Sequence, residues 1–291
     1  MKGKIIKSVA GVYTVISEDD QSYTLKPKGI FRYHGINPKV GDNVDFNDAS
    51  ITMIEERKNS FVRPQIANVD NAILVSSLKR PDLSYELLDR FLINIEEANV
   101  QPIIVITKCD LASLVELNDM KEKMAYYSQY YPVFLSSING IQEIDKFNSL
   151  IKGKINVVSG QTGVGKSFLL NYLSPSLKLL TQDISEALGR GKTTTRETSL
   201  FDINGTFIAD TPGFSSLEYD SIKPTDLKEY YPEFVALLNE CRYHQCLHIN
   251  EPGCIIKEKV MKGEILKSRY ASYLKIYDEI KNKKPFYKKE I

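Results

Sequence analysis

The chain has 291 residues, a formal net charge of +1 and 42% hydrophobic residues, the composition of an ordinary globular protein long enough for two or three domains. Because the net charge is near zero, an overall positive field that attracts nucleic acid is excluded, and any basic surface must be local. Residues 1–8 lack the apolar core of a signal peptide, and no run of about 20 apolar residues could cross a membrane. We therefore expect a cytoplasmic protein without membrane contact.

Residues 1–62 are expected to form a small closed β-barrel, with an OB-fold as the first choice. Short alternating strands separated by turn residues are predicted at 12–16, 22–25, 43–46 and 51–54. One loop region mixes basic and aromatic side chains, as surfaces that bind single-stranded nucleic acid do: Lys26, Lys28, Arg32, Tyr33, His34 and Lys39. A solvated loop on a barrel used only for protein contacts is the alternative.

Residues 63–222 carry the pattern of a parallel sheet covered by helices. Apolar runs predict buried strands at 72–75, 102–106 and 155–159, and the apolar spacing over 85–97 predicts an amphipathic helix. Alternating strands and helices of this kind build an α/β domain.

A glycine-rich segment between the strand 155–159 and the apolar run 168–173 has the strand, loop and helix order of a phosphate-binding loop. Glycines let several backbone N–H groups approach a phosphate, and the helix N-terminus adds more. Lys166 is expected to contact the β and γ phosphates and Ser167 to bind Mg²⁺. A glycine-rich turn that binds nothing is the alternative. The predicted contacts are Gly160, Gln161, Thr162, Gly163, Val164, Gly165, Lys166, Ser167 and Phe168.

The end of the strand 102–106 carries the residues expected to read the base. The Asp110 carboxylate can accept the N1–H and amino hydrogens of guanine, whereas adenine would leave it unsatisfied. The stem of Lys108 can cover the base, and the Thr107 hydroxyl can tie this loop to the phosphate loop. A plain strand-ending turn is the alternative when the segment is taken alone. The expected contacts are Thr107, Lys108, Cys109 and Asp110, with Ser136 and Ser137 closing over the base from the other side.

Two later segments are expected to sense the γ phosphate. An apolar strand ends at Asp210, which would hold Mg²⁺ through water, and the Gly213 N–H would contact the γ phosphate. In the Gly- and Thr-rich segment 189–196, either Thr194 or Thr195 could complete the magnesium shell when the γ phosphate is present. A flexible polar loop is the alternative for that segment. The residues assigned to catalysis are Lys166, Asp210, Thr194 and Thr195.

Residues 223–291 are expected to form a mainly helical zinc-binding domain. Three thiols and one imidazole would complete a tetrahedral shell with no open position, as in structural zinc sites; these are Cys241, Cys246, His248 and Cys254. His244 could compete as a ligand, and cysteines with a redox role or no role are the alternative. Because the domain is small, the metal should supply much of its folding free energy.

The end of the chain combines an aromatic stripe with positive charge. Helical spacing predicts a packing face made of Leu266, Tyr270, Tyr273, Leu274, Tyr277 and Ile280. The basic tail could meet nucleic-acid phosphates or could simply be solvated; it contains Lys281, Lys283, Lys284, Lys288 and Lys289.

The base-reading segment precedes the phosphate loop, which is the reverse of the order in ordinary GTPases. A circular permutation explains this order, because strand ends in a parallel sheet can be reconnected without moving the site. With its barrel, permuted order and Cys/His tail, the chain resembles, over nearly its whole length, the ribosome small-subunit-dependent GTPase A family (RsgA-type).

The resemblance implies hydrolysis of GTP to GDP, stimulated by the 30S subunit, and a role in late 30S maturation with contact to 16S ribosomal RNA. It also implies one structural Zn²⁺ per chain and Mg²⁺ with the nucleotide, and we expect a monomer. Thr193 stands where the family commonly has a histidine, and Phe214 stands where Ras-like enzymes have a water-orienting glutamine. We therefore predict slow intrinsic hydrolysis that a partner accelerates.

Two other functions compete with this interpretation. One is a P-loop ATPase or kinase that acts on a small molecule, and the other is an RNA-binding module whose nucleotide is purely structural. Replacing Asp110 with Asn discriminates the first, because it should shift the preference toward xanthine nucleotides in a guanine site and change nothing in an ATPase or kinase. Turnover stimulated by the ribosome would exclude the second.

Overall fold

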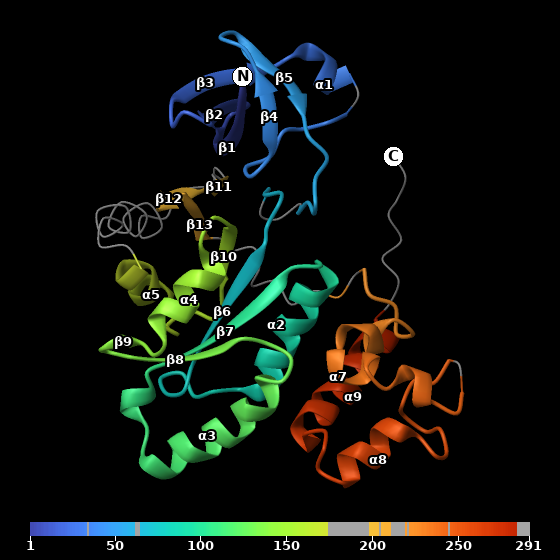
Figure 1. The fold of residues 1–291 in the computed structure, drawn as a ribbon. Coiled ribbons are helices and arrows are strands. Elements are labelled where there is room, and N and C mark those ends of the chain that lie inside the picture. Colours follow the sequence, from blue (N-terminus) through green and yellow to red (C-terminus); the bar gives the residue numbers. More distant parts are fainter. Residues whose placement is uncertain are drawn as a thin grey trace.

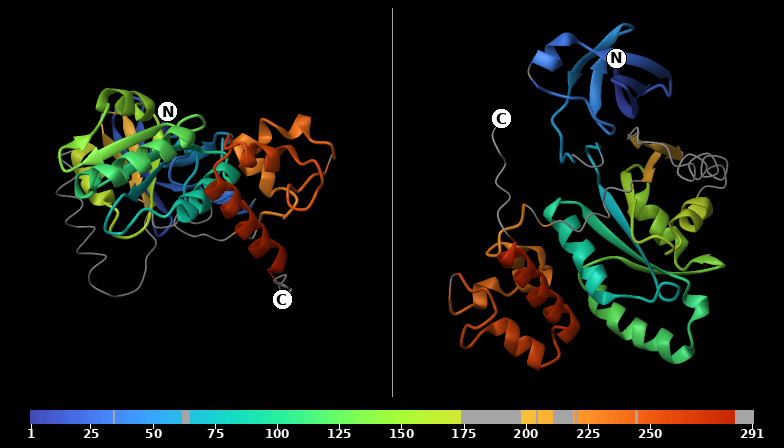
Figure 2. Two further views of the ribbon diagram at one scale, coloured as in Figure 1. Left: turned by 90° about the horizontal axis from the view of Figure 1, so that it is seen from below. Right: turned by 180° about the vertical axis from the view of Figure 1, so that it is seen from behind.

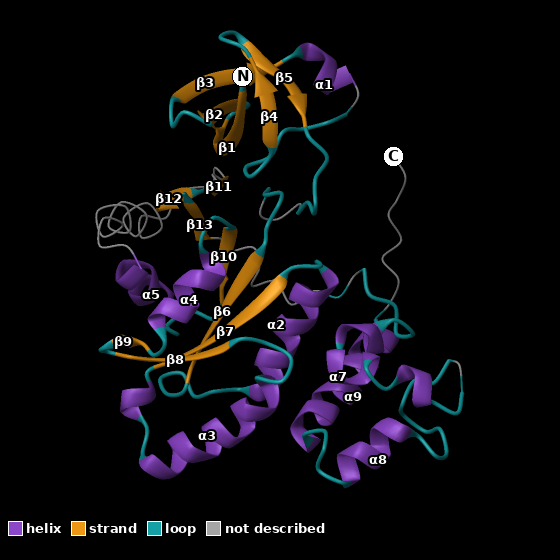
Figure 3. Ribbon diagram, viewed as in Figure 1, coloured by secondary structure: helices purple, strands orange, loops and turns teal. Residues whose placement is uncertain are grey.

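The computed structural model describes residues 1–33, 35–61, 65–173, 198–203, 205–210, 219, 221–243 and 245–283. Three regions follow one another along the chain (Figure 1). Coloured by secondary structure, the N-terminal region is mainly strands, the central region mixes strands and helices, and the C-terminal region is helical (Figure 3). This is the multidomain fold class predicted from the sequence.

The N-terminal region is a closed barrel. Its strands follow the order β1-β2-β3-β5-β4, and β4 pairs back with β1. Alternate residues point inward and are buried, among them Ile5, Val15 and Val44. Strand β1 was not predicted from the sequence, because Lys2, Lys4 and Lys7 surround its buried residue Ile5. The elements are β1 (Lys2–Val9), β2 (Val12–Ser17), β3 (Ser22–Pro27), α1 (Gly29–Tyr33), β4 (Asn43–Phe46) and β5 (Ser50–Ile54).

The central region is built on a sheet with the order β12-β13-β10-β6-β7-β8-β9. The strands from β13 to β8 are parallel to their neighbours, whereas β12 and β9 are antiparallel edges. The strands are β6 (Asn71–Ser77), β7 (Gln101–Thr107), β8 (Val133–Ser137), β9 (Gly140–Ile141), β10 (Ile155–Ser159), β12 (Phe201–Ile203) and β13 (Thr206–Asp210).

Helices cover both faces of this sheet, because successive strand residues point to opposite sides. Ile73 and Val75 belong to a buried cluster with Leu169 of α5, whereas Leu74 belongs to a second cluster with Leu88 of α2. The helix predicted over 85–97 has the predicted bounds, and the Ser84 side chain caps it. The helices α3 and α4 were not predicted. The helices are α2 (Tyr85–Glu97), α3 (Leu114–Tyr127), α4 (Ile144–Ile151) and α5 (Lys166–Leu173).

The C-terminal region packs against α2 of the central region. Its long helix α9 contacts α2 along the interface, and Figure 2 shows the same region from two further sides. The predicted aromatic stripe is a packing face, since Tyr273, Tyr277 and Ile280 are buried. The elements are η3 (Leu227–Tyr230), α7 (Pro232–Val235), η4 (Leu238–Glu240), α8 (Ile255–Met261) and α9 (Lys267–Asn282).

A buried ionic network fastens α9 to α2. Arg269 of α9 is 1% exposed and donates from Nη1 to Asp89 of α2 at 2.7 Å and from Nε to Glu233 of α7 at 2.6 Å. The Tyr127 hydroxyl of α3 also donates to Asp89, and the guanidinium lies over the Tyr231 ring. Burial lowers the pKa of Arg269, but Glu233 and Asp89 outweigh it and raise the pKa well above its usual value, so the guanidinium stays charged.

The barrel is joined to the central sheet by a short strand pair. Strand β11 (Thr198–Ser199) pairs antiparallel with β1, and the Leu200 N–H donates to the Ile6 carbonyl at 2.8 Å. A further contact places the Lys4 ammonium 5.7 Å from the centre of the Phe207 ring in β13. None of the helices in the described ranges has the length and apolar character needed to cross a membrane.

Candidate functional site

The strand order brings the predicted nucleotide-binding segments to one edge of the central sheet. The phosphate-loop segment follows β10, the segment 107–110 begins at the last residue of β7, and Ser136 and Ser137 are the last two residues of β8. Since these strands are parallel, their carboxyl ends lie at the same edge, where ligands of open α/β sheets bind. Segments that are distant in sequence therefore form one site.

The phosphate-loop segment needs glycine at its start. A Cβ at Gly160 would lie 2.1 Å from the carbonyl oxygen of Val75, and its φ of +140° is a conformation that other residues rarely adopt. The loop thus passes directly against strand β6 before α5 begins at Lys166. Ser167 is exposed in the first turn of this helix, where a metal ion held by a bound phosphate could reach its hydroxyl.

Two lysines hold the phosphate-loop segment through its carbonyl groups. The Lys166 ammonium donates to the Gly160 and Gln161 carbonyls at 2.9 and 2.7 Å. The Lys108 ammonium donates to the Gly163 carbonyl at 2.6 Å and also to the Arg80 carbonyl. Lys108 therefore connects the base-reading segment to the phosphate-binding segment through its ammonium.

Thr107 also connects the base-reading segment to the phosphate-loop segment. Its hydroxyl donates to the Val164 carbonyl at 2.5 Å and lies 3.3 Å from the Ser76 carbonyl. This is the link that the sequence predicts, made by a threonine that is almost completely buried. The neighbouring Cys109 is also buried, burial raises the pKa of its thiol, and its sulfur lies 3.3 Å from the Ile106 carbonyl.

Asp110 is oriented by the turn that follows β8. The Ile138 N–H donates to its Oδ1 at 3.2 Å, while Asp110 itself is exposed at the sheet edge. Ser136 is buried and Ser137 is half-buried in the strand that leads to this turn. Ser136 and Ser137 were predicted from the sequence, but the Ile138 contact was not, because a backbone donor leaves no signal in residue type.

The predicted γ-phosphate sensors are only partly covered by the structure. Strand β13 pairs with β10, with Asp210 opposite Val158, so its backbone ends at the same edge as the phosphate loop. Only the backbone of Asp210 is described. The predicted residues Thr194, Thr195 and Gly213 lie outside the described residues. The residues Thr193, Phe214 and His244 are outside them as well.

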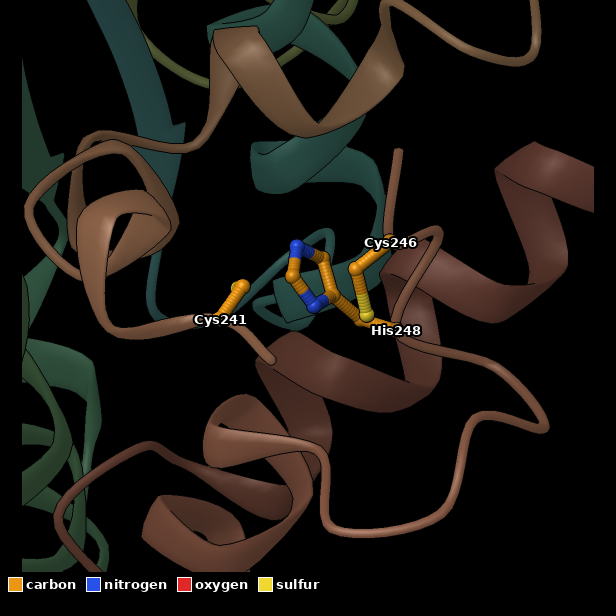
Figure 4. A group of neighbouring side chains, drawn as sticks. All are labelled: Cys241, Cys246 and His248. Carbon is orange, nitrogen blue, oxygen red and sulfur yellow. The ribbon is translucent and has the colours of Figure 1, made fainter. Parts of the chain in front are cut away.

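A second candidate site lies in the C-terminal region. The side chains of Cys241, Cys246 and His248 point toward one another (Figure 4), and their ligand atoms all lie within 4.8 Å of each other. Cys254, the fourth predicted ligand, approaches the group through its sulfur, which is 3.4 Å from His248 Nδ1. Helix α9 supports the loop, because the Tyr270 and Tyr273 hydroxyls donate to the carbonyls of His248 and Leu247.

The donor set of this second site fits a soft divalent metal ion. Burial lowers the pKa of His248 to about 4, aided by Lys228, so its imidazole is neutral. Burial raises the pKa of Cys246 to about 11, and only a bound cation would favour its thiolate. His248 Nε2 is buried and has no hydrogen-bond partner among the described residues. Neutral imidazole and thiols in this arrangement could hold Zn²⁺.

Comparison with protein families matches two consecutive parts of the chain. The model described as the RsgA N-terminal domain matches residues 2–53, and the model described as the RsgA GTPase matches residues 54–220. The second match alone covers more than half of the chain.

Curated relatives match over almost the whole chain. A protein of Geobacillus sp. (strain WCH70) named small ribosomal subunit biogenesis GTPase RsgA is 46% identical, covering 98% of this chain and 99% of its own. A Streptococcus mutans protein of the same name is 44% identical, covering 99% of this chain and 98% of its own.

Two solved structures share the fold. YjeQ from Thermotoga maritima matches with a TM-score of 0.84 and 33% identity, covering 97% of this chain and 99% of that one. YloQ, described as a circularly permuted GTPase, matches with a TM-score of 0.81 and 38% identity, covering 98% of this chain and 96% of that one. The permuted order inferred from the sequence is thus confirmed, and the chain belongs to the RsgA GTPase family.

Proposed function

We propose that the protein hydrolyses GTP to GDP and phosphate and acts in the assembly of the small ribosomal subunit. The observation that carries the proposal is the Thr107 to Val164 hydrogen bond, which joins a guanine-type acidic loop to a phosphate loop at one sheet edge. The relatives named small ribosomal subunit biogenesis GTPase support it. They do not favour an ATPase or a kinase.

Each residue of the site has a task in this reaction. Asp110 accepts two hydrogens of guanine, while the Lys108 stem covers the base. Lys166 turns from the Gly160 and Gln161 carbonyls to the β and γ phosphates, where charge develops as the bond to the γ phosphate breaks. Ser167 and Asp210 would hold Mg²⁺, which would neutralise part of this charge, with Thr194 or Thr195 completing its shell.

We further propose that ordering of the γ-phosphate sensors depends on the 30S subunit. The residues expected to sense the γ phosphate include Thr194, Thr195 and Gly213, and neither Thr193 nor Phe214 can act as a general base. Hydrolysis by the protein alone is therefore slow, and the subunit accelerates it by fixing the loops around the nucleotide.

The barrel is the proposed contact with 16S ribosomal RNA. Lys26 and Lys28 are exposed just before α1, and Ile30, Tyr33 and Ile36, within or just after that helix, are exposed as well. Lysines meet phosphates and a large exposed ring offers a platform on which a base can stack. Replacing Tyr33 with Ala should weaken 30S binding about 10-fold without changing GDP affinity, and equal 30S affinity would refute this contact.

The remaining proposals concern organisation. We assign residues 1–62 to the barrel, 63–222 to the GTPase domain and 223–291 to the zinc domain, in which Cys241, Cys246, His248 and Cys254 hold one structural Zn²⁺. The protein is proposed to be a cytoplasmic monomer.

Phosphate release from GTP and from ATP, each with and without purified 30S subunits, tests the proposed function. We expect slow release from GTP alone, release at least about 10-fold faster with subunits, and none from ATP above the level of a Lys166→Ala control. Comparable release from ATP, or a rate with GTP that subunits do not change, would contradict the proposal.

A further inference from the structure

Helix α5 presents an aromatic pair at its surface. Phe168 and Tyr172 lie one turn apart, with ring centroids 6.4 Å apart and ring planes 18° from parallel. They are 41% and 39% exposed, although large rings on a helix normally face the core. The pair begins directly after Ser167, the residue expected to bind Mg²⁺. An exposed aromatic stack beside the phosphate loop calls for an explanation other than core packing.

The Tyr172 ring rests against the backbone of the turn that follows β8. A Cβ added at Gly140, the first residue of β9, would lie 2.3 Å from Cε2 and Cζ of Tyr172 and 2.4 Å from its hydroxyl oxygen. Real Cβ atoms do not approach other atoms so closely, so a larger residue here would require the Tyr172 ring to shift from this position. Gly140 also has a φ of +106°, which disfavours any other residue.

This contact completes a chain of contacts around the nucleoside end of the site. Asp110 accepts from the Ile138 N–H, and Ile138 and Gly140 belong to the same turn. Gly140 touches Tyr172, Tyr172 stacks on Phe168, and Phe168 follows Ser167. The base-reading carboxylate and the phosphate-binding helix are therefore linked through the turn as well as through Thr107.

The turn is also held by short-range contacts: the Asn139 N–H donates to the Ser137 hydroxyl at 3.2 Å, and the Gln142 N–H donates to the Leu135 carbonyl at 2.8 Å. Strand β9 contains only Gly140 and Ile141, which pair with Ser137 and Ser136 of β8, and the Ile138 side chain is exposed. A two-residue strand pair alone is a weak restraint. The Tyr172 ring is placed so as to limit movement of the turn toward α5.

We propose that Tyr172 is a positioning residue that holds the turn after β8 against α5, and thereby holds the Ile138 N–H that donates to Asp110, with Phe168 supporting the ring. A carboxylate held in this way can accept two hydrogens of guanine, whereas adenine offers an acceptor at N1. The inference rests on the proposed function, because it specifies how the same site recognises its base.

A double-mutant cycle on GDP affinity, measured by titration calorimetry with Mg²⁺, tests the contact. Tyr172→Ala should weaken GDP binding about 10-fold, whereas Tyr172→Phe keeps the ring and should stay within about 2-fold. Gly140→Ala introduces both backbone strain and the clash. Its effect should shrink at least about 5-fold in the Tyr172→Ala background, because the clash is removed there. Additive effects would overturn the proposed contact.

A second measurement separates positioning from general loosening. Wild type and Tyr172→Ala are compared for GDP and IDP, which lacks the 2-amino group proposed to donate to Asp110. If Tyr172 positions Asp110 through the turn, Tyr172→Ala loses most of the preference for GDP. Equal weakening for both ligands, with the preference retained, would overturn the proposal.

Two controls make the outcomes distinguishable. Tyr243→Ala removes a tyrosine of equal exposure, 40%, far along the chain in the C-terminal region, and should leave both affinities unchanged. Thermal unfolding of each variant without nucleotide checks that it is folded. Failure of the wild type to bind GDP would refute the proposed function itself, whereas normal binding by wild type and Tyr172→Ala alike would refute only the role of Tyr172.

Discussion

The nucleotide edge of the central sheet and the interface between α2 and α9 are organised in opposite ways. At the nucleotide edge, backbone carbonyls and exposed side chains meet, and the linking contacts come from Thr107 and Lys108. At the interface, Arg269 is buried between Asp89 and Glu233, on segments far apart in sequence. The first region leaves polar groups exposed that a ligand could contact, whereas in the second the charged groups already pair with one another.

This difference predicts a separation of effects. Changes at the interface should alter the free energy of unfolding and leave nucleotide affinity per folded molecule nearly intact. Changes to exposed residues of the nucleotide edge, such as Asp110, should do the reverse, because their loss leaves little buried polar surface unpaired.

The largest expected effect is that of Arg269→Met. It leaves the carboxylates of Asp89 and Glu233 buried without their cation, which should lower the free energy of unfolding by about 3–5 kcal/mol. Denaturant titration of the full chain measures this. Replacing both acids as well, with Asp89→Asn and Glu233→Gln, should recover part of the loss. A loss below about 1 kcal/mol for Arg269→Met would show that the network is not an anchor.

Removal of zinc should have the next largest effect. With free Zn²⁺ buffered at 100 times its dissociation constant, binding contributes about 2.7 kcal/mol to the stability of the C-terminal region. Chelation should therefore lower the unfolding midpoint of that region while GDP binding is largely retained. Cys246→Ser should make the protein insensitive to chelator. An unfolding curve that zinc does not move would contradict the proposed metal site.

A smaller effect is expected at Thr107. Thr107→Val removes the hydroxyl that donates to the Val164 carbonyl, and the lost bond should weaken GDP binding about 5-fold, or about 1 kcal/mol. Thr107→Ser keeps the hydroxyl and serves as the matched control. If Val and Ser at this position bind GDP equally, the link between the two segments does not matter for the ligand.

The smallest effect concerns the exposed ion pairs that flank the buried network. Hydrogen bonds from Lys275 and then Arg90 lower the pKa of Glu86, and Arg90 lowers the pKa of Glu279. Because the folded state favours the ionised carboxylates, their contribution is complete above the usual pKa near 4.5 and is lost as the pH falls through the lowered values. Exposed pairs of this kind contribute about 0.2–1 kcal/mol each.

A comparison of wild type with the Glu86→Gln, Glu279→Gln double variant tests this pH dependence. The wild type should be slightly more stable at pH 7, and the gap should close as the pH is lowered past the lowered pKa values. A gap that stays constant across this range would show that the two carboxylates do not gain from ionisation in the folded protein.

The segments that meet at the nucleotide edge could be predicted from the sequence, because each is a short contiguous motif. Gly160 to Ser167 and Thr107 to Asp110 each contain residue types that phosphate and guanine require. The bounds of α2 were predicted from regular apolar spacing alone, and the structure shows the Ser84 cap at its start. In both cases the signal lies within a few residues of the structure that it predicts.

The interface could not be predicted in this way. Arg269 is one of many basic residues in the C-terminal region, and no neighbouring residue in the sequence indicates that it is buried. Its partner Asp89 lies in α2 of the central region. Strand β1 was missed because lysines surround its inward residue Ile5. The Tyr172 contact depends on an absent side chain at Gly140. Such long-range pairings arise only when the chain is folded.

The central claim is that Asp110 and Lys166 serve opposite ends of one guanine nucleotide, and Asp110→Asn tests it most directly. An amide at this position cannot accept both hydrogens from guanine, but it can pair with the 2-oxo group of xanthine. Affinities for GDP and XDP, with Lys166→Ala as a second variant, provide the measurement. We predict that Asp110→Asn loses GDP affinity about 100-fold and gains XDP binding, and that Lys166→Ala weakens both nucleotides. Unchanged GDP affinity in Asp110→Asn, with no binding of XDP, would contradict the claim.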